Sequence, residues 1–232
     1  MRLRVSGTLL AAAFLLSGCG SDYGSASLDT DDQKASYGIG RQMGQNLKPA
    51  QSRLDMAAFI RGVQDAMADV EPAVPDSVVQ MALEAFSQAV MEEQQAQQEA
   101  AATRNLEEGQ AYLAENGAKE GVVTTESGLQ YEVLREGDGP SPTADSRVSI
   151  HYKGTLIDGT QFDSSYDRNE PAVFGVGGVI AGFSEALQLM PVGSHYRFVV
   201  PGDLAYGPNG SGQTIGPNAT LIFEIELLEI VE

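Results

Sequence analysis

The sequence predicts an α+β protein with an all-helical N-terminal part, a long connecting helix and a C-terminal antiparallel sheet that holds one short helix. Apolar residues recur at helical spacing from Thr30 onward. The stretch between Met91 and Leu106 has no Gly, no Pro and no large apolar side chain, yet it consists mostly of good helix formers. After Gly121 the apolar residues alternate as they do in strands, and 10 of the 16 aromatic residues lie there.

Length, charge and composition narrow the class of protein. The chain has 232 residues, of which 42% are hydrophobic, and this is enough for two small cores. Its formal net charge of -18 at pH 7 repels a phosphate backbone, which argues against nucleic-acid binding. One Cys and two His cannot supply a zinc or iron–sulfur site, and no calcium-binding loop with its closing Glu occurs. We therefore expect no metal and no cofactor.

Residues 1–18 predict a secretory signal peptide. Two arginines precede an apolar stretch, Leu9 to Leu16, that is about half the length of a membrane-spanning helix. The stretch ends in Leu-Ser-Gly-Cys, which resembles the lipobox of bacterial lipoproteins and implies that Cys19 is lipidated. The alternative is an ordinary signal peptide with an incidental Cys. Residues 19–29 are small and polar, which predicts a flexible tether.

The residues after Cys19 bear on where the protein is sorted. In the sorting pattern that such lipoproteins share, Gly20 and Ser21 rather than an Asp favour the outer membrane. The lipid anchor would then be the only membrane contact, and the domains that follow would face the periplasm.

Residues 30–75 predict a helical domain with two helices. Thr30 and Gln33 have the spacing of a capping box, and the first helix is expected to run to Lys48. The second helix is expected to start near Asp55, where apolar residues begin to recur at offsets of three, four and seven.

Gly38 and Gly40 admit a second interpretation, as part of a nucleotide-binding loop. That loop requires a preceding strand and a third glycine three residues after the second, and this segment has neither. Close packing of helices through glycine is therefore the favoured interpretation.

Residues 76–118 predict one long connecting helix, beginning near Asp76 and ending near Asn116–Gly117. Residues Glu92 to Asn105 would form a bare helical arm about 21 Å long with no core beneath it. A disordered linker is the competing interpretation, because helices without tertiary support are marginal in water. Before the arm, apolar residues at alternating spacings of four and three form the seam of two nearly parallel helices: Val79, Leu83, Phe86 and Val90.

Residues 119–232 predict a β domain with one amphipathic helix from Phe183 to Met190. His151 and His195 lie on the outward-facing phase of their strands, so we expect both to be solvated rather than catalytic. The sequence has no nucleophile elbow, no Walker loop and no recognisable triad. Three segments alternate apolar and polar residues as strands with one buried face do: 148–153, 196–200 and 223–227.

Six ordered stretches of the C-terminal half carry a more specific pattern. They are VSIHYKGTL (148–156), DGTQFDSS (158–165), GVIAGF (178–183), LMPVG (189–193), LAYG (204–207) and ATLIFEIEL (219–227). Together they resemble, in order and spacing, the FKBP-type peptidyl-prolyl cis-trans isomerases. The helical half, with YGIG (37–40) and FIRG (59–62), resembles the N-terminal dimerisation domain of the macrophage infectivity potentiator branch of that family.

The resemblance implies a half-barrel sheet wrapped around one short helix, with a shallow apolar pocket for a proline ring. It also implies a homodimer joined through the N-terminal helices. The activity would be peptidyl-prolyl isomerisation in the cell envelope, together with a chaperone role. The partners would be proline-containing, unfolded or partly folded polypeptides that have been exported.

The resemblance also implies roles for individual residues. Asp163 and Tyr206 would be catalytic, with Tyr206 donating a hydrogen bond to a substrate carbonyl and Asp163 setting the local electrostatics. The main-chain amide of Ile180 would hold a second carbonyl. Arg168 is expected to pair with Asp163 or Tyr152, because an unpaired carboxylate beside an apolar pocket is costly. The substrate-binding residues would be Tyr152, Phe162, Val179, Ile180, Phe183, Ile215 and Phe223.

Two departures from the family pattern bear on the pocket. Its floor, usually Trp, is Phe183, and an aromatic wall common in eukaryotic members is Ala172; both changes would widen the pocket. We therefore expect only weak binding of tacrolimus-like macrolides. The alternative function is a lipid-anchored dimeric holdase, a chaperone that grips apolar segments and has little isomerase activity.

Overall fold

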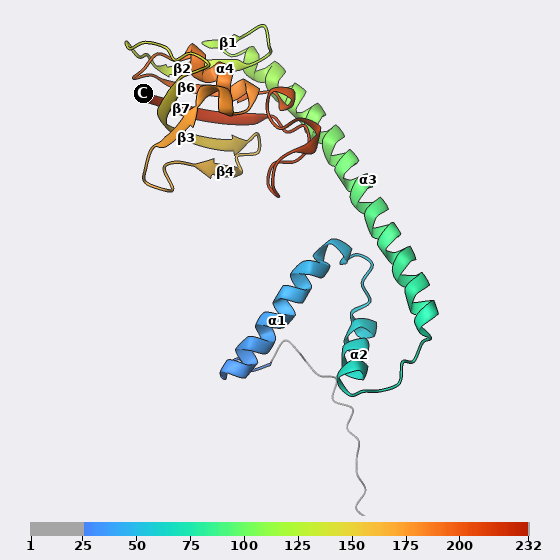
Figure 1. Ribbon diagram of the computed structural model, residues 1–232. Helices are drawn as coiled ribbons and strands as arrows, with labels where there is room; N and C mark the ends of the chain where they lie inside the picture. Colours follow the sequence, from blue (N-terminus) through green and yellow to red (C-terminus); the bar gives the residue numbers. More distant parts are fainter. Residues whose placement is uncertain (1–25, 232) are drawn as a thin grey trace, which may run out of the picture. The chain divides into compact units, whose positions relative to one another are not determined.

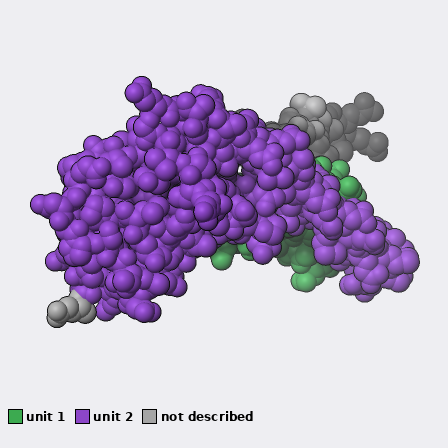
Figure 2. Space-filling model, turned by 90° about the horizontal axis from the view of Figure 1, so that it is seen from above, with its two compact units in different colours: residues 1–69 green, residues 70–232 purple. Residues whose placement is uncertain are grey.

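The structure, a computed structural model, describes residues 26–231 and divides the chain into two compact units (Figure 1). Unit 1 is Met1–Asp69 and unit 2 is Val70–Glu232; Figure 2 draws unit 1 in green and unit 2 in purple. The predicted signal peptide and Cys19 lie outside the described residues. The domain limits expected at residues 75 and 118 stay predictions.

Unit 1 contains two capped helices. The Thr30 hydroxyl accepts from the Gln33 amide at 3.3 Å, and the Gln33 side chain accepts from the Thr30 amide at 2.9 Å, which is the predicted capping box. Asp55 caps the second helix through the amides of Ala57 and Ala58. The elements are α1 (Asp31–Leu47), η2 (Lys48–Ala50) and α2 (Met56–Met67).

Unit 2 begins with α3 (Asp76–Gly117), an unbroken helix of 42 residues (Figure 1). The helical interpretation of the polar arm is therefore confirmed over the linker interpretation. The arm is, however, shorter than predicted. Ala101 and Ala102 are half-buried, and the Asn105 amide group donates to the Pro217 carbonyl at 2.8 Å. The prediction that nothing lies beneath the segment up to Asn105 is wrong at its C-terminal end.

The last turns of α3 are fixed to the sheet by close packing and by hydrogen bonds. A Cβ atom at Gly109 would lie 2.4 Å from the Thr220 hydroxyl, so the helix can approach this closely only because residue 109 is glycine. The buried Asn116 side chain donates to the Gln130 side chain at 2.9 Å and accepts from Arg197 at 3.3 Å. This part of α3 therefore belongs to the packed body of unit 2.

The rest of unit 2 is built on an antiparallel sheet of seven strands in the order β1-β2-β6-β7-β3-β4, with β5 also paired to β3. The longest pairing joins β3 to β7, and its register shifts between Ser149 and Ile150. The strands are β1 (Val122–Thr124), β2 (Gln130–Arg135), β3 (Arg147–Leu156), β4 (Gln161–Ser164), β5 (Ala172–Gly175), β6 (His195–Val200) and β7 (Leu221–Val231). The predicted α+β fold class is confirmed.

One short helix, α4 (Ala181–Leu189), completes the core. Phe183, Leu187 and Met190 are buried in the same apolar cluster as Ile150 and Ile225 of the sheet, as the amphipathic pattern predicts. Among residues 26–231, no helix combines the length and the apolar character that crossing a membrane requires. The connections also contain the 3-10 turns η3 (Val176–Gly178), η4 (Gly202–Leu204) and η5 (Gly207–Asn209).

The two histidines differ from the expectation of solvated side chains, because both are half-buried. His151 contacts the Ser165 hydroxyl through Nδ1 at 3.0 Å and stacks on Tyr166, with the ring centroids 4.9 Å apart. His195 has its Nε2 atom buried, and no group in the described part of the chain bonds to it. Strand alternation places a side chain on a face of the sheet but does not show what covers that face.

Candidate functional site

A pocket of about 720 Å³ lies where α4 begins, bounded by β3, β4, β5, β7 and the loop 211–215. The chain brings these lining residues together from segments that are far apart in the sequence. All nine residues expected in the site lie in the lining: Tyr152, Phe162, Asp163, Val179, Ile180, Phe183, Tyr206, Ile215 and Phe223. Their individual roles stay predictions.

The floor of the pocket is aromatic and closely packed. Phe183 is only 5% exposed and meets the ring of Phe223 edge-on at 5.0 Å between centroids. Tyr152 and Phe174 also lie edge-on to it, each with centroids 6.1 Å away. Such edge-to-face contacts between aromatic rings stabilise the fold beyond the contribution of the apolar area that they bury. The floor therefore presents a fixed apolar surface.

Gly154 of β3 allows two rings to lie over the strand. A Cβ atom at this position would come within 2.5 Å of the Phe162 ring and 3.0 Å of the Phe223 ring. Those distances are shorter than any ordinary carbon contact. The absence of a side chain at residue 154 thus sets the width of this end of the pocket.

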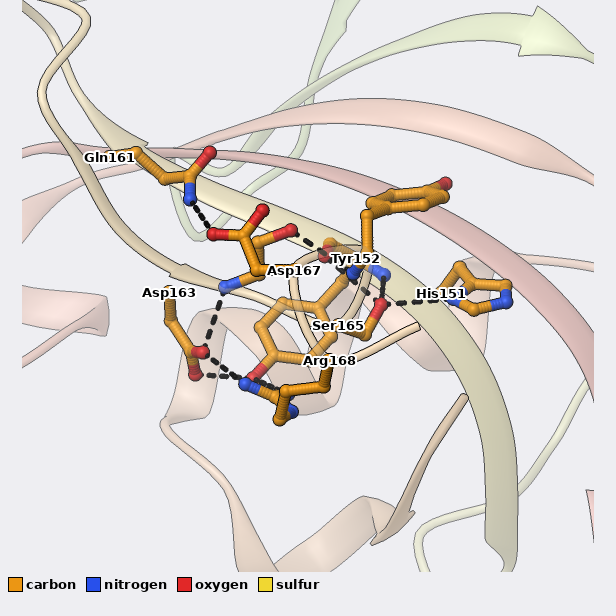
Figure 3. Close-up of polar contacts among 9 residues, drawn as sticks. His151, Tyr152, Gln161, Asp163, Ser165, Asp167 and Arg168 are labelled. Atoms are coloured by element: carbon orange, nitrogen blue, oxygen red, sulfur yellow. Dashed lines mark hydrogen bonds and ion pairs between the residues drawn. The ribbon is translucent and has the colours of Figure 1, made fainter. Parts of the chain in front are cut away.

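One wall of the pocket is polar, and its groups bond to one another (Figure 3). The Tyr152 hydroxyl donates to Asp163, which also accepts from Arg168 at 2.7 Å. Arg168 reaches the Tyr152 hydroxyl at 3.2 Å as well, so the predicted pairing of Arg168 occurs with both candidates. The three side chains fix one another at the edge of the apolar floor.

These contacts keep each group in one charge state. Burial raises the pKa of Tyr152, and its hydrogen bond to Asp163 raises it further. Burial opposes ionisation of Asp163, but the hydrogen bonds from Tyr152 and Arg168 outweigh it and lower the pKa of that carboxyl group. At neutral pH the wall therefore holds a neutral phenol, a carboxylate and a guanidinium.

Ser165 supports this wall from behind, a role that the sequence did not reveal. Its buried hydroxyl accepts from the Tyr152 amide at 2.9 Å and lies 3.0 Å from His151 Nδ1. Its own amide donates to the Tyr152 carbonyl at 3.0 Å. Ser165 thereby fixes the backbone that carries Tyr152. The DGTQFDSS stretch includes this Ser, but nothing in its spacing indicates the contact.

Two hydrogen-bond donors at the pocket are free. Among the described residues, none bonds to the Tyr206 hydroxyl, and Tyr206 is 39% exposed. The main-chain amide of Ile180, just before α4, also has no partner in residues 26–231. Each can therefore donate to a carbonyl oxygen of a bound molecule without breaking an existing bond.

Strand β5 contributes one aromatic residue to the pocket lining. Phe174 lines the pocket, whereas Ala172 is half-buried in β5 and is not part of the lining. Both residues point to the same face of β5, since they are two positions apart. The expectation that Ala172 widens the pocket stays a prediction, since a small side chain that does not reach the lining leaves that position of the wall open.

The arrangement suits the binding of a neutral apolar ring beside carbonyl groups. No cluster of three or more side chains suited to metal binding occurs within the described chain. The lining has no nucleophile paired with a base, and its one ionised side chain, Asp163, is already bonded to Tyr152 and to Arg168 behind it. Such a site can act by excluding water and by placing donors against carbonyl oxygens.

Two domain families match this chain. The domain described as amino terminal to FKBP-type peptidyl-prolyl isomerase matches residues 32–133. The domain described as FKBP-type peptidyl-prolyl cis-trans isomerase matches residues 139–228, which contain all nine of the expected site residues.

Curated proteins and solved structures are similar over most of the chain. The FKBP-type 22 kDa peptidyl-prolyl cis-trans isomerase of Escherichia coli K12 is 49% identical over 209 residues, covering 88% of this chain and 98% of that protein. The outer membrane protein MIP of Legionella longbeachae is 41% identical over 204 residues, which is 88% of each chain. The crystal structure of FkpA from Escherichia coli matches with a TM-score of 0.70 at 39% identity, covering 88% of this chain and 98% of that one.

Proposed function

The chain belongs to the FKBP-type peptidyl-prolyl cis-trans isomerases, and we propose that its pocket accelerates rotation about X-Pro bonds in polypeptides exported to the bacterial cell envelope. One observation supports this assignment of the site more strongly than any other observation does. An aromatic floor centred on Phe183 lies beside two free donors, the Tyr206 hydroxyl and the Ile180 amide.

The proposed mechanism needs no covalent step. Rotation of an amide bond costs about 18–20 kcal/mol, because its resonance must be lost, and water stabilises the planar form. The pocket binds the proline ring against Phe183 and removes that water. The Tyr206 hydroxyl and the Ile180 amide hold carbonyl oxygens in the positions of the twisted state, so the transition state binds more tightly than the planar amide.

The decisive experiment measures two activities of the same preparation of residues 25–232. One is protease-coupled isomerisation of a proline tetrapeptide, and the other is suppression of aggregation of an unfolded protein. We expect both. Suppression of aggregation without faster isomerisation would favour the holdase alternative, which rests on the replacement of the usual Trp by Phe183.

We expect kcat/KM for the tetrapeptide to be nearly flat between about pH 6 and pH 8, because no proton is transferred. Because the pKa of Asp163 is lowered, its stabilising ionised form is lost only as the pH falls below the ordinary range of an aspartate carboxyl group. The raised pKa of Tyr152 keeps the phenol protonated. A pH–rate profile at constant ionic strength checks this. A bell-shaped profile within the range would contradict the mechanism.

Macrolide binding tests the pocket floor. A Trp offers a wider aromatic face than Phe183, and each well-placed aromatic contact is worth about 0.5–1.5 kcal/mol. We expect Phe183→Trp to tighten binding of a tacrolimus-like macrolide by about threefold to tenfold. Isothermal titration of both proteins measures this, with thermal melts to show that the variant is folded. Equal or weaker binding by a folded variant would mean that the rings around Phe183 leave no room for Trp.

We further propose that the protein is an outer-membrane lipoprotein facing the periplasm. The lipobox at Cys19 supports the anchor, and the name of the Legionella longbeachae relative, an outer membrane protein, agrees with the location. Cys19→Ser is expected to leave an unprocessed precursor without lipid. Labelling with a radioactive fatty acid checks this, and Ser27→Ala, in the expected tether, serves as the matched control. Normal processing of a wild type that takes up no label would refute the proposal.

A homodimer joined through the N-terminal helices is also proposed. Of the described residues in unit 1, only Ala50 is buried, so its apolar side chains have little to pack against within the chain. In the predicted seam of α3, Val79 is 38% and Leu83 is 55% exposed. Apolar surface left open in this way is typical of an interface with another chain. A second copy provides a complementary surface, and a dimer would place two isomerase pockets around one chaperone client.

A further inference from the structure

A second depression of about 840 Å³ adjoins the pocket, between the polar arm of α3 and the loop 208–217. We propose that it binds the main chain of the substrate for about five residues on one side of the proline. We call it the arm groove. The inference rests on the proposed assignment of the proline pocket and extends it from a single residue to an extended polypeptide.

The arm groove continues directly from the proline pocket. Gly212, Gln213 and Ile215 line both cavities. They belong to a tight hairpin that two main-chain hydrogen bonds close, from the Ser211 amide to the Ile215 carbonyl at 2.8 Å and back at 3.1 Å. A polypeptide that leaves the pocket over this hairpin enters the arm groove.

The helix side of the groove is one face of α3. Each of its lining residues has another three or four positions away, which is the spacing of a single helical face. Between the first and last of them the helix rises about 16 Å, and an extended chain of about five residues covers the same length. These lining residues are Met91, Gln94, Gln95, Gln98, Glu99 and Ala102.

The chemistry of this face suits a peptide main chain. A glutamine amide both donates and accepts hydrogen bonds, as a peptide group does, and does not discriminate between neighbouring side chains. Within residues 26–231, no group bonds to the side chains of Gln94 or Gln98, whereas Gln95 bonds to Glu99 at 2.9 Å. The two free amides can therefore pair with a bound main chain.

Two features add detail to the proposal. Glu99 is the sole ionisable side chain in the lining of the arm groove, so basic residues in the substrate are favoured over acidic ones. At the far end, the Asn105 side chain bonds to the Pro217 carbonyl at 2.8 Å and holds the loop at a fixed distance from the helix.

The experiment compares a proline tetrapeptide with peptides extended by about six polar residues on either side, using residues 25–232. We expect one extension to raise kcat/KM about tenfold. The double variant Gln94→Ala with Gln98→Ala is expected to remove most of this gain and to leave tetrapeptide turnover unchanged, which corresponds to two neutral hydrogen bonds. Ala preserves the helix. Gln88→Ala with Gln97→Ala makes the same change outside the lining and is the matched control.

A second comparison uses extensions that carry Lys or Glu. At low salt the Lys extension is expected to give about threefold higher kcat/KM, and Glu99→Gln is expected to abolish the difference. Fluorescence anisotropy of the same labelled peptides measures binding without turnover, so a failure of the isomerase site can be told apart from a failure of the groove. The proposal is overturned if neither extension helps, if the gain survives the double variant, or if the tetrapeptide loses as much as the extended peptide.

Discussion

Replacing Asp163 with Ala is expected to lower kcat/KM for a proline tetrapeptide by about tenfold to a hundredfold. Loss of the ion pair with Arg168 contributes little to this decrease, because both side chains are 44% exposed and solvent screens their charges. The larger loss comes from the Tyr152 hydroxyl, which loses its charged acceptor, a bond worth about 1.5–3 kcal/mol. The guanidinium of Arg168 then remains at the pocket wall without its carboxylate.

Three comparisons separate this effect from a general loss of structure. Tyr206→Phe removes one neutral donor and is expected to cost less, about 0.5–1.5 kcal/mol in transition-state binding. Asp145→Asn changes an exposed carboxylate outside the pocket lining and is expected to leave turnover unchanged. Asp163→Ala combined with Arg168→Met is expected to recover part of the activity. Wild-type turnover by a folded Asp163→Ala variant would show that the wall plays no part in catalysis.

Introducing Glu at both Val79 and Leu83 is expected to convert the dimer to a monomer. Each residue is exposed within the single chain, so neither charge disturbs the fold of α3. Across a dimer seam, however, an unpaired buried charge costs about 3–5 kcal/mol, a weakening of roughly a thousandfold or more. Light scattering is expected to show the mass fall from twice the chain mass to that of a single chain.

The matched control places the same charge on the C-terminal part of unit 2. Val123 in β1 is 47% exposed, and Val123→Glu is expected to leave the dimer intact. The monomeric variant is expected to isomerise the tetrapeptide within about twofold of the wild type, because the pocket lies within one chain. If the double variant remained dimeric, the interface would lie elsewhere than on this seam.

Patterns that depend on neighbours in the sequence were predictable. The capping residues Thr30 and Asp55 mark the starts of α1 and α2 because a cap acts within one turn. The length of α3 followed from the absence of Gly and Pro in its polar arm and from the helix-forming residues there. The pocket lining followed from ordered motifs, which carry family information and not only local preference.

Contacts between distant segments were not predictable. Asn105 appears in the sequence as one more polar residue of the arm, and only the fold places the Pro217 carbonyl beside it. Alternation in β5 puts Ala172 and Phe174 on one face without showing which of them reaches the pocket. His151 lies on the outer phase of β3, as expected, but Tyr166 covers it with a stacked ring.

The docking of the last turns of α3 has a practical consequence for dissecting the protein. A fragment that starts at Gly121 would lose Asn116 and the Leu113 carbonyl, the two hydrogen-bond partners of the buried Gln130 side chain. It would also remove the Tyr112 hydroxyl, to which the Arg197 guanidinium donates a hydrogen bond at 2.8 Å. Each of these lost hydrogen bonds is worth about 0.5–1.5 kcal/mol to stability. The smallest fragment that keeps the isomerase fold at full stability therefore begins before Asn105, inside a helix and not at the loop that follows it.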